Sequence, residues 1–289
     1  MRRLFLTILL LFSTCVVAPA ADATLFEKAG AFGWVIVTEH NGLRTLQFER
    51  GGARQTVVKM GDPAHLELPY APVALTGLSV CEAPRRVLIV GLGGGTLPMF
   101  IRQYFPEAVI DGVDINPDVV DVARRFLGFR EDSRMRGIVA DGRKFIEETR
   151  EPYDIIFLDA FGAYSVPPPL STVEFLRAVR KALKPSGVAV GNIWSREYNR
   201  LYDPMVRTYQ ETFDELYLLE VRGVGNRILL GLPRKENFTR TSLAARAGAL
   251  SRAKGFRFDM SSLVHSGFNH LVERDASARV LTDAEMLKP

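Results

Sequence analysis

The chain has 289 residues, of which 47% are hydrophobic and 24% are charged, and its formal net charge at pH 7 is +4. This length allows one large domain or two modest ones, and the composition is typical of a soluble globular protein rather than a disordered or fibrous one. Removing Arg2 and Arg3 from the 37 basic residues leaves 35 against 33 acidic ones, and the remaining basic residues form no run, so the charge does not indicate a nucleic-acid partner.

Residues 1–22 are predicted to be a signal peptide. Two arginines precede an apolar run over residues 4–18, and the small residues of "APAADA" offer cleavage after Ala20 or Ala23. This pattern predicts a periplasmic or secreted protein. The alternative is an uncleaved segment that anchors the chain in a membrane.

Residues 23–80 are predicted to form a small antiparallel β-meander and a connecting helix. Three strand-like stretches, "WVIVTEH", "RTLQFER" and "RQTVVKM", fall between residues 34 and 60 and are separated by "NG" and "GG", which are hairpin signals. A helix is expected over residues 64–80. It leads into the second unit, residues 81–289.

From residue 85 onward, strand patterns alternate with helix patterns. Strands are predicted over 87–91, 108–115, 135–141, 153–160 and 188–194, and helices over 96–106, 116–129, 142–150, 171–187 and 203–213. Asn116 and Ser171 are predicted to cap the second and fourth of these helices.

The end of the chain completes the predicted sheet. Two further strands, over 215–221 and 226–232, are close enough in sequence to form an antiparallel pair, and a helix over 242–255 precedes an irregular tail. Repeated βα units imply an α/β fold with a doubly wound, methyltransferase-like (Rossmann-type) sheet, preceded by the small β-meander.

Glycines and acidic residues follow the first four strands of this predicted sheet. Ligands of such sheets bind beyond the carboxyl ends of the strands, so these residues are expected to border one nucleoside-binding crevice. In chain order they are Gly91, Gly93, Gly94 and Gly95, then Asp114, then Asp141 and Gly142, and finally Asp159.

Each group of these residues has an expected role. The glycines would let backbone N–H groups approach a ligand closely. Asp114 lies nineteen residues after Gly95, close to the spacing of an acid that binds ribose hydroxyls. Asp141 would accept a hydrogen bond from an adenine amino group, and Asp159 remains for the reacting partner. The alternatives are a carboxylate at a helix N-terminus for Asp114 and a helix cap for Asp141.

Four stretches together, "VLIVGLGGGTLP", "IDGVDINPDVVDVARRFLGF", "IVADGRKFI" and "YDIIFLDAF", resemble the spermidine synthase (polyamine aminopropyltransferase) family. The resemblance spans roughly residues 30 to 289. It implies transfer of an aminopropyl group from decarboxylated S-adenosylmethionine to a diamine, which is the small-molecule amine substrate, and release of methylthioadenosine. It also implies Asp159 as the catalytic aspartate, Gln55 as a nucleotide contact, Tyr70 beside the substrate, and a homodimer. The loop after Asp159 is expected to form a lid with Tyr164 as a wall beside the substrate; the alternative for Tyr164 is ordinary loop packing.

The sequence departs from this family at two places. The glycine loop "GLGGGT" lacks the acidic residue that the family has there, and Gly162 stands where the family has a second aspartate. Both departures favour intact S-adenosylmethionine as donor, so an S-adenosylmethionine-dependent methyltransferase is one alternative and a non-catalytic polyamine or nucleoside binder is another. No metal is expected, because the four histidines, His40, His65, His265 and His270, do not have the spacing of a metal site.

Overall fold

Two β-sheets form the framework of the protein, in a computed structural model that describes residues 23–81, 83–161 and 165–287. The smaller sheet is antiparallel and has the order β1 (Ala23–Gly30), β2 (Gly33–His40), β3 (Leu43–Gln47) and β4 (Arg54–Lys59). The last three strands are those predicted for the meander. Strand β1 was not predicted, because most of its side chains are exposed and give no alternating apolar pattern. The predicted signal peptide lies outside the described residues.

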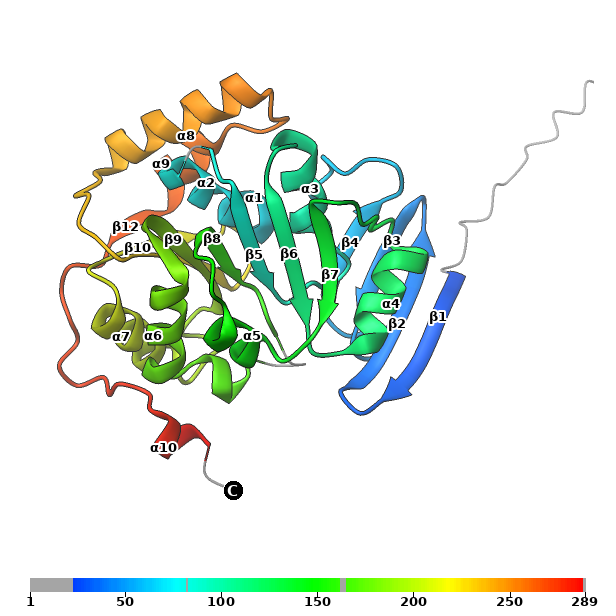
Figure 1. The fold of residues 1–289 in the computed structure, drawn as a ribbon, viewed down its shortest axis with the longest axis horizontal. Coiled ribbons are helices and arrows are strands. Elements are labelled where there is room, and N and C mark those ends of the chain that lie inside the picture. The colour runs from blue at the N-terminus through cyan, green and yellow to red at the C-terminus, as the bar shows by residue number, and fades with distance from the viewer. Residues whose placement is uncertain (1–22, 82, 162–164, 288–289) are drawn as a thin grey trace, which may run out of the picture.

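The smaller sheet packs with one face against helix α4 (Pro117–Phe126), as Figure 1 shows. Alternating apolar residues of the strands meet the apolar face of the helix and bury a separate small core. Its members are Val35, Val37, Leu46, Val58, Val119, Val122 and Leu127. This contact fixes the small sheet beside the start of the larger one.

The larger sheet has eight strands. Their order is β12 (Phe268–His270), β10 (Glu215–Glu220), β11 (Asn226–Leu232), β9 (Leu183–Trp194), β8 (Tyr153–Leu158), β5 (Arg86–Val90), β6 (Val109–Asp114) and β7 (Met135–Val139). Strands β9, β8, β5, β6 and β7 are parallel, and β11 runs antiparallel between β9 and β10. From β5 the chain adds β6 and β7 on one side, and it then adds β8 and β9 on the other side. The strand order therefore reverses between β5 and β8. This is the doubly wound, methyltransferase-like sheet that the sequence predicts.

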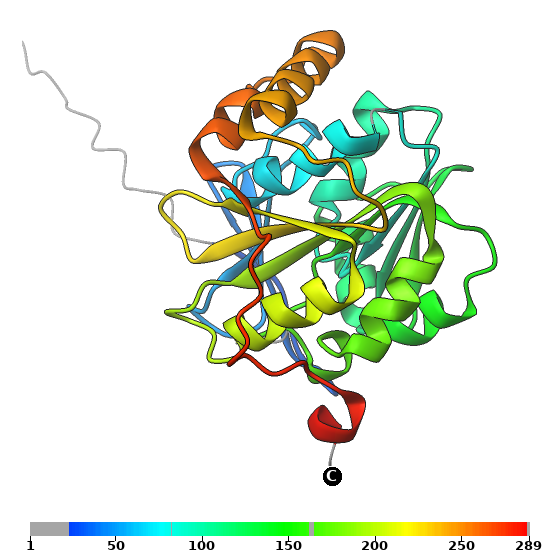
Figure 2. The same cartoon turned by 90° about the vertical axis from the view of Figure 1, so that its left-hand side faces the viewer.

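Helices cover both faces of the larger sheet (Figures 1 and 2). One face carries α1 (Tyr70–Ala74), α2 (Leu78–Cys81), α3 (Thr96–Tyr104), α4, α8 (Arg240–Lys254) and α9 (Met260–Gly267). The other carries α5 (Gly142–Glu148), α6 (Val173–Ala182) and α7 (Tyr202–Thr212). Among the described residues, no helix is both long enough and apolar enough to span a bilayer.

Four local predictions were wrong. The helix predicted over 171–187 ends at Ala182, because β9 already begins at Leu183. The helix expected from residue 64 begins only at Tyr70, because Pro69 disfavours helical backbone at the residue before it, and a 3-10 turn over Leu75–Gly77 separates α1 from α2. The cap of α6 is Thr172 rather than Ser171, whose hydroxyl donates instead to a carbonyl of the preceding turn. The tail contains α9, β12 and a short helix α10 (Asp283–Met286).

The last described residues, 271–287, form a segment that we call the C-terminal strap. It runs over α7 and α6 and ends in α10 (Figure 2). Leu281 is fully buried, its N–H donates to Thr208 Oγ1 over 2.9 Å, and its carbonyl accepts from Val173 N over 2.8 Å. The strap therefore completes the core on this face of the sheet.

Candidate functional site

The carboxyl ends of four parallel strands meet at the point where the chain order of the large sheet reverses. Asp159 N donates to the carbonyl of Val90, and Gly91 N donates to the carbonyl of Val113, each over 2.8 Å. Ala140 N donates to the carbonyl of Asp114 over 3.0 Å. The structure thus places the residues that follow β5, β6, β7 and β8 side by side along one edge, which is where such sheets bind ligands.

The loop after β5 needs glycine because of its backbone conformation and its close packing against neighbouring backbone. Gly91 has a φ of +96°, and a Cβ atom there would lie 2.4 Å from the carbonyl oxygen of Asp159. Gly95 has a φ of +82° and caps α3. At both positions the left-handed backbone would strain any larger residue, and at Gly91 the Cβ atom would also clash with the neighbouring backbone. The loop therefore lies directly against the backbone of Asp159, just after the end of β8.

Each of the four glycine N–H groups has an acceptor within the protein. Gly91 N donates to Val113 O, Gly95 N to Leu92 O, Gly93 N to Asp114 Oδ2 over 3.3 Å and Gly94 N to Thr56 Oγ1 over 2.9 Å. The sequence suggested a loop that offers these groups to a ligand. In the structure, these N–H groups donate to acceptors within the protein, and the hydrogen bond to Thr56 joins the loop to β4 of the smaller sheet.

Asp114 connects the glycine loop to the start of α4. Its Oδ1 accepts from Asn116 N over 3.0 Å, and Asn116 in turn caps α4, as predicted. Burial raises the pKa of Asp114, while backbone hydrogen bonds from Asn116 and Gly93 lower it. Beside it, Ile115 is 48% exposed, which is unusual for a large apolar side chain at a strand end and was not singled out from the sequence. An exposed apolar face and a carboxylate together suit the base and ribose of a nucleoside.

Asp141 is the N-cap of α5, the alternative that the sequence left open. Its Oδ1 accepts from Arg143 N over 2.8 Å and from Lys144 N over 3.2 Å. Gly142 follows it, and a Cβ atom at Gly142 would lie 2.5 Å from a methyl group of Val90. Arg143 forms two hydrogen bonds with Asp283 of the strap, over 2.7 and 2.6 Å. The strap thereby holds the turn that contains Asp141 and Gly142.

Asp159 is held by two donors, one on each carboxylate oxygen. Tyr70 Oη donates to Oδ2 and Asn192 Nδ2 donates to Oδ1, both over 2.8 Å. Burial raises the pKa of Asp159 to about 6, against the two hydrogen bonds, which lower it. Burial and the neighbouring carboxylate also raise the pKa of Tyr70, so its hydroxyl stays protonated and remains a donor. The structure therefore brings the predicted Tyr70 and Asp159 into direct contact.

Asn192 and Asn226 belong to this network but were not identified from the sequence. Asn226 Nδ2 donates to Asn192 Oδ1 over 3.0 Å, and the two side chains are 9% and 4% exposed. The signal that could have found them is an amide within the apolar runs "VAVGNIW" and "GNRILLGL", because a buried amide needs hydrogen-bond partners.

Two other predicted site residues, Gln55 and Tyr164, are not among the described side chains that hold Asp159. Gln55 lies in β4 at a β-bulge, where Leu46 pairs with Thr56 and Gln47 with Arg54, so it has no partner in the register. It directly precedes Thr56, which contacts the glycine loop. Tyr164 and Gly162 lie outside the described residues. The described part of the chain holds no group of three or more His, Cys, Asp or Glu side chains arranged to bind a metal.

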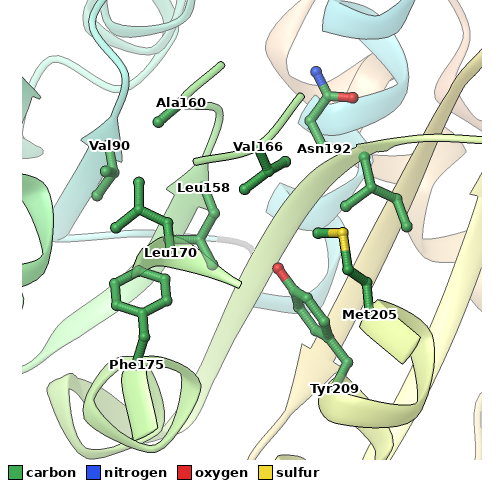
Figure 3. Close-up of a pocket in the computed structure, with 10 residues that line it drawn as sticks. Val90, Leu158, Ala160, Val166, Leu170, Phe175, Asn192, Met205 and Tyr209 are labelled. Carbon is green, nitrogen blue, oxygen red and sulfur yellow. The ribbon is translucent and has the colours of Figure 1, made fainter. Parts of the chain in front are cut away.

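Two cavities lie close to residues of the site, although neither is lined by Asp114, Asp141 or Asp159. A small one, of about 10 Å³, lies between the sheet and the helices α6 and α7 (Figure 3). Figure 3 shows Asn192 at its rim, with the amide directed away from Met205 and Tyr209. A larger groove, of about 580 Å³, lies behind the glycine loop between α3, Val58–His65 and Leu127–Arg130. Neither contains a predicted site residue.

Comparisons with known proteins show which family the sequence matches. Residues 72–214 match the family model described as the spermine/spermidine synthase domain. A polyamine aminopropyltransferase from Vibrio vulnificus is 32% identical over 271 residues, which are 90% of this chain and 88% of that protein.

Two solved structures extend the comparison. Human methyltransferase-like protein 13 in complex with SAH (S-adenosylhomocysteine) is 30% identical, with a TM-score of 0.59 over 65% of this chain and 93% of that one. A probable spermidine synthase from Corynebacterium glutamicum has a TM-score of 0.71 over 92% of this chain and 97% of its own, at 18% identity, which shows a shared fold.

Proposed function

Because the chain belongs to the spermine/spermidine synthase family, we propose that it transfers an aminopropyl group from decarboxylated S-adenosylmethionine to a diamine. The observation that carries this proposal is the carboxylate of Asp159, which lies at the strand edge that binds ligands in such sheets and accepts hydrogen bonds from Tyr70 and Asn192. Each oxygen of this carboxylate accepts one hydrogen bond and keeps a second lone pair, which can accept a hydrogen bond from the substrate amine.

The chemistry requires one base. The nitrogen lone pair of the acceptor amine forms a bond to the aminopropyl carbon next to the sulfonium, and the carbon–sulfur bond breaks. The electron pair of that bond stays on sulfur, which becomes the neutral thioether of methylthioadenosine. The proton of the new ammonium passes to Asp159 and then to water. A pKa of about 6 leaves this carboxylate ionised at neutral pH and gives it a greater proton affinity than an ordinary aspartate.

We assign the nucleoside to the crevice beside Asp159. Asp114 is proposed to bind the ribose hydroxyls and Asp141 the adenine amino group, with Ile115 against the base. The residues proposed to shape this pocket are Gln55, Gly91, Gly93, Gly95 and Gly142. The four glycine N–H groups of the loop already have acceptors, which favours a donor that has lost its carboxylate.

A second candidate function is methyl transfer from intact S-adenosylmethionine. It is favoured by the 30% identity to a methyltransferase-like protein that was solved with SAH, and by the absence of an acidic residue from the glycine loop. The two functions differ in their nucleoside product, which is methylthioadenosine for aminopropyl transfer and S-adenosylhomocysteine for methyl transfer.

The test is to incubate the purified chain with each donor and a mixture of diamines and polyamines, and to identify the nucleoside that is released. We expect methylthioadenosine from decarboxylated S-adenosylmethionine. Replacing Asp159→Asn should reduce turnover by about 10²- to 10⁴-fold, because the general base is lost. Nucleoside binding, measured by calorimetry, should change little.

The matched control is Asp121→Asn. Asp121 lies on α4, pairs with Arg125, and its side chain is 46% exposed. This variant should retain full turnover. Unchanged turnover in Asp159→Asn would remove the catalytic role of Asp159, and S-adenosylhomocysteine as the only nucleoside product would assign the protein to methyl transfer.

A further inference from the structure

Behind Asp159, two buried amides form a chain of hydrogen bonds that links β9 to β11. Asn192 pairs with Ile228 in the register of these antiparallel strands, and Asn226 pairs with Trp194, so the two asparagines are diagonal neighbours. Asn226 Nδ2 donates to Asn192 Oδ1, and Asn192 Nδ2 donates to Asp159 Oδ1. Both side chains are more than nine-tenths buried, so water does not replace these partners.

The chemistry of these groups fixes the direction of the chain. An ionised carboxylate only accepts, so Asn192 must turn its NH₂ group toward Asp159. Its carbonyl oxygen then faces Asn226, which can satisfy that oxygen only with its own NH₂ group. Rotation of Asn192 by half a turn would place its carbonyl oxygen against the carboxylate. Asn226 opposes this rotation, because the rotated NH₂ group of Asn192 would meet the NH₂ group of Asn226.

We propose that Asn226 is a positioning residue, which acts through Asn192 to hold the carboxylate of Asp159 in the orientation that receives the proton of the acceptor amine. This inference rests on the proposed function for its catalytic meaning. Its structural content, that Asn226 controls the donor to Asp159, can be measured without turnover.

The inference predicts a specific change at Asp159. Removing the NH₂ group of Asn226 frees Asn192 to rotate, and Asp159 loses a donor that stabilises its charged form. The pKa of Asp159 then rises further above its ordinary value, because its other contact, with the Tyr70 hydroxyl, remains. Tyr70 is the titratable side chain that the structure places in hydrogen-bond contact with Asp159, and Asn192 is uncharged.

The closing experiment titrates the side-chain carboxyl carbons of ¹³C-labelled aspartate by NMR in the unliganded protein. The Asp159 signal is assigned by its loss in Asp159→Asn. In Asn226→Leu, which is similar in size but cannot donate, the midpoint of Asp159 should rise by about one pH unit, a tenfold change in proton affinity. Turnover should fall about tenfold with the KM for the nucleoside unchanged.

A matched control separates positioning from general loss of stability. Gln210 is also a buried amide, and it donates to the carbonyls of Leu271 and Glu273, away from the crevice. Gln210→Met should lower the melting temperature without moving the Asp159 midpoint. Where Asn226→Leu does not fold, Asn226→Ala removes the same donor and carries the same expectation.

The outcomes are distinct. An Asp159 midpoint that stays in place in the Asn226 variants, or that moves equally in Gln210→Met, overturns the inference. A wild-type protein that releases no nucleoside product refutes the proposed function, and the NMR midpoints then still decide whether Asn226 controls the carboxylate.

Discussion

At the scale of single residues, Asp159 shows how opposing effects set the properties of one carboxylate. Burial alone would favour the protonated form, whereas the donors Tyr70 and Asn192 favour the charged form. The result is a pKa of about 6, so the group is ionised at pH 7 and loses its charge in mildly acidic solution. Catalysis that needs the ionised carboxylate should therefore decline as the pH falls through 6.

Tyr70→Phe tests this balance. The variant removes a donor to the charged form, so the pKa of Asp159 should rise and the acidic limb of the kcat/KM profile should move upward by about one pH unit. The control is Tyr153→Phe, which removes a tyrosine-to-aspartate hydrogen bond of the same 2.8 Å length, to Asp111, outside the crevice. A limb that moves equally in both variants, or in neither, would contradict the assigned role of Tyr70.

The sequence reveals the site residues that a local pattern marks, but not the contacts that depend on how distant segments pair. Asp114, Asp141 and Asp159 could be found because each lies at or just beyond the carboxyl end of a strand, and parallel strands end at one edge. Asn192 and Asn226 stand out as amides within apolar runs, but their contact with each other and with Asp159 depends on how β9 and β11 align, which local sequence does not specify. The capping role of Asp141 is local and was open as an alternative, since a carboxylate before a helix has both uses.

At the scale of elements, the glycine loop shows that a motif can serve packing as well as binding. Gly91 lies against the backbone of Asp159, and Gly94 lies against Thr56 of the smaller sheet. The loop thus joins three elements before any ligand is present. Such a loop is expected to be rigid in the free protein, because its shape is fixed by backbone contacts.

Gly91→Ala should therefore destabilise the protein by clearly more than the strain of a left-handed residue. The matched control is Gly223→Ala, because Gly223 has a φ of +76° and open space around its Cβ position. We expect the control to lose about 1 kcal/mol of unfolding free energy and Gly91→Ala to lose about 2 kcal/mol more. Equal losses in urea unfolding would show that the approach to Asp159 has no energetic weight.

The predictability of the elements follows their burial. Strands β5, β8 and β11 are largely apolar runs between turn signals, and helices α3, α4 and α6 have strong amphipathic patterns, so these elements could be predicted. Strand β1 is mostly exposed at the edge of its sheet, and β12 has three residues that pair with β10 only through the tertiary fold. Neither carries a periodic signal of its own.

At the scale of the whole molecule, the C-terminal strap joins parts that are far apart in the sequence. Its Leu281 fills the core under α6 and α7, and its Asp283 accepts hydrogen bonds from Arg143 and from Thr172. Because Arg143 belongs to the turn that holds Asp141 and Gly142, the strap supports the proposed nucleoside pocket from behind.

Leu281→Ala should lower the free energy of unfolding by about 2 to 5 kcal/mol, since it empties a fully buried position. The control in the same segment is Leu287→Ala, because Leu287 is 45% exposed and should change stability by less than about 0.5 kcal/mol. Thermal and urea unfolding measure both. A small effect at Leu281 would mean that the strap is an accessory to the fold rather than part of its core.

The glycine loop, whose four glycine N–H groups already have acceptors, has a consequence for how related nucleosides would compete for the proposed pocket. Intact S-adenosylmethionine would bring a carboxylate that leaves water there, and a carboxylate that loses its hydration without gaining partners binds unfavourably. The decarboxylated donor carries no such group. For the proposed aminopropyl transfer, intact S-adenosylmethionine is therefore expected to be a weak competitive inhibitor, and turnover of the decarboxylated donor is expected to continue in a mixture of the two nucleosides.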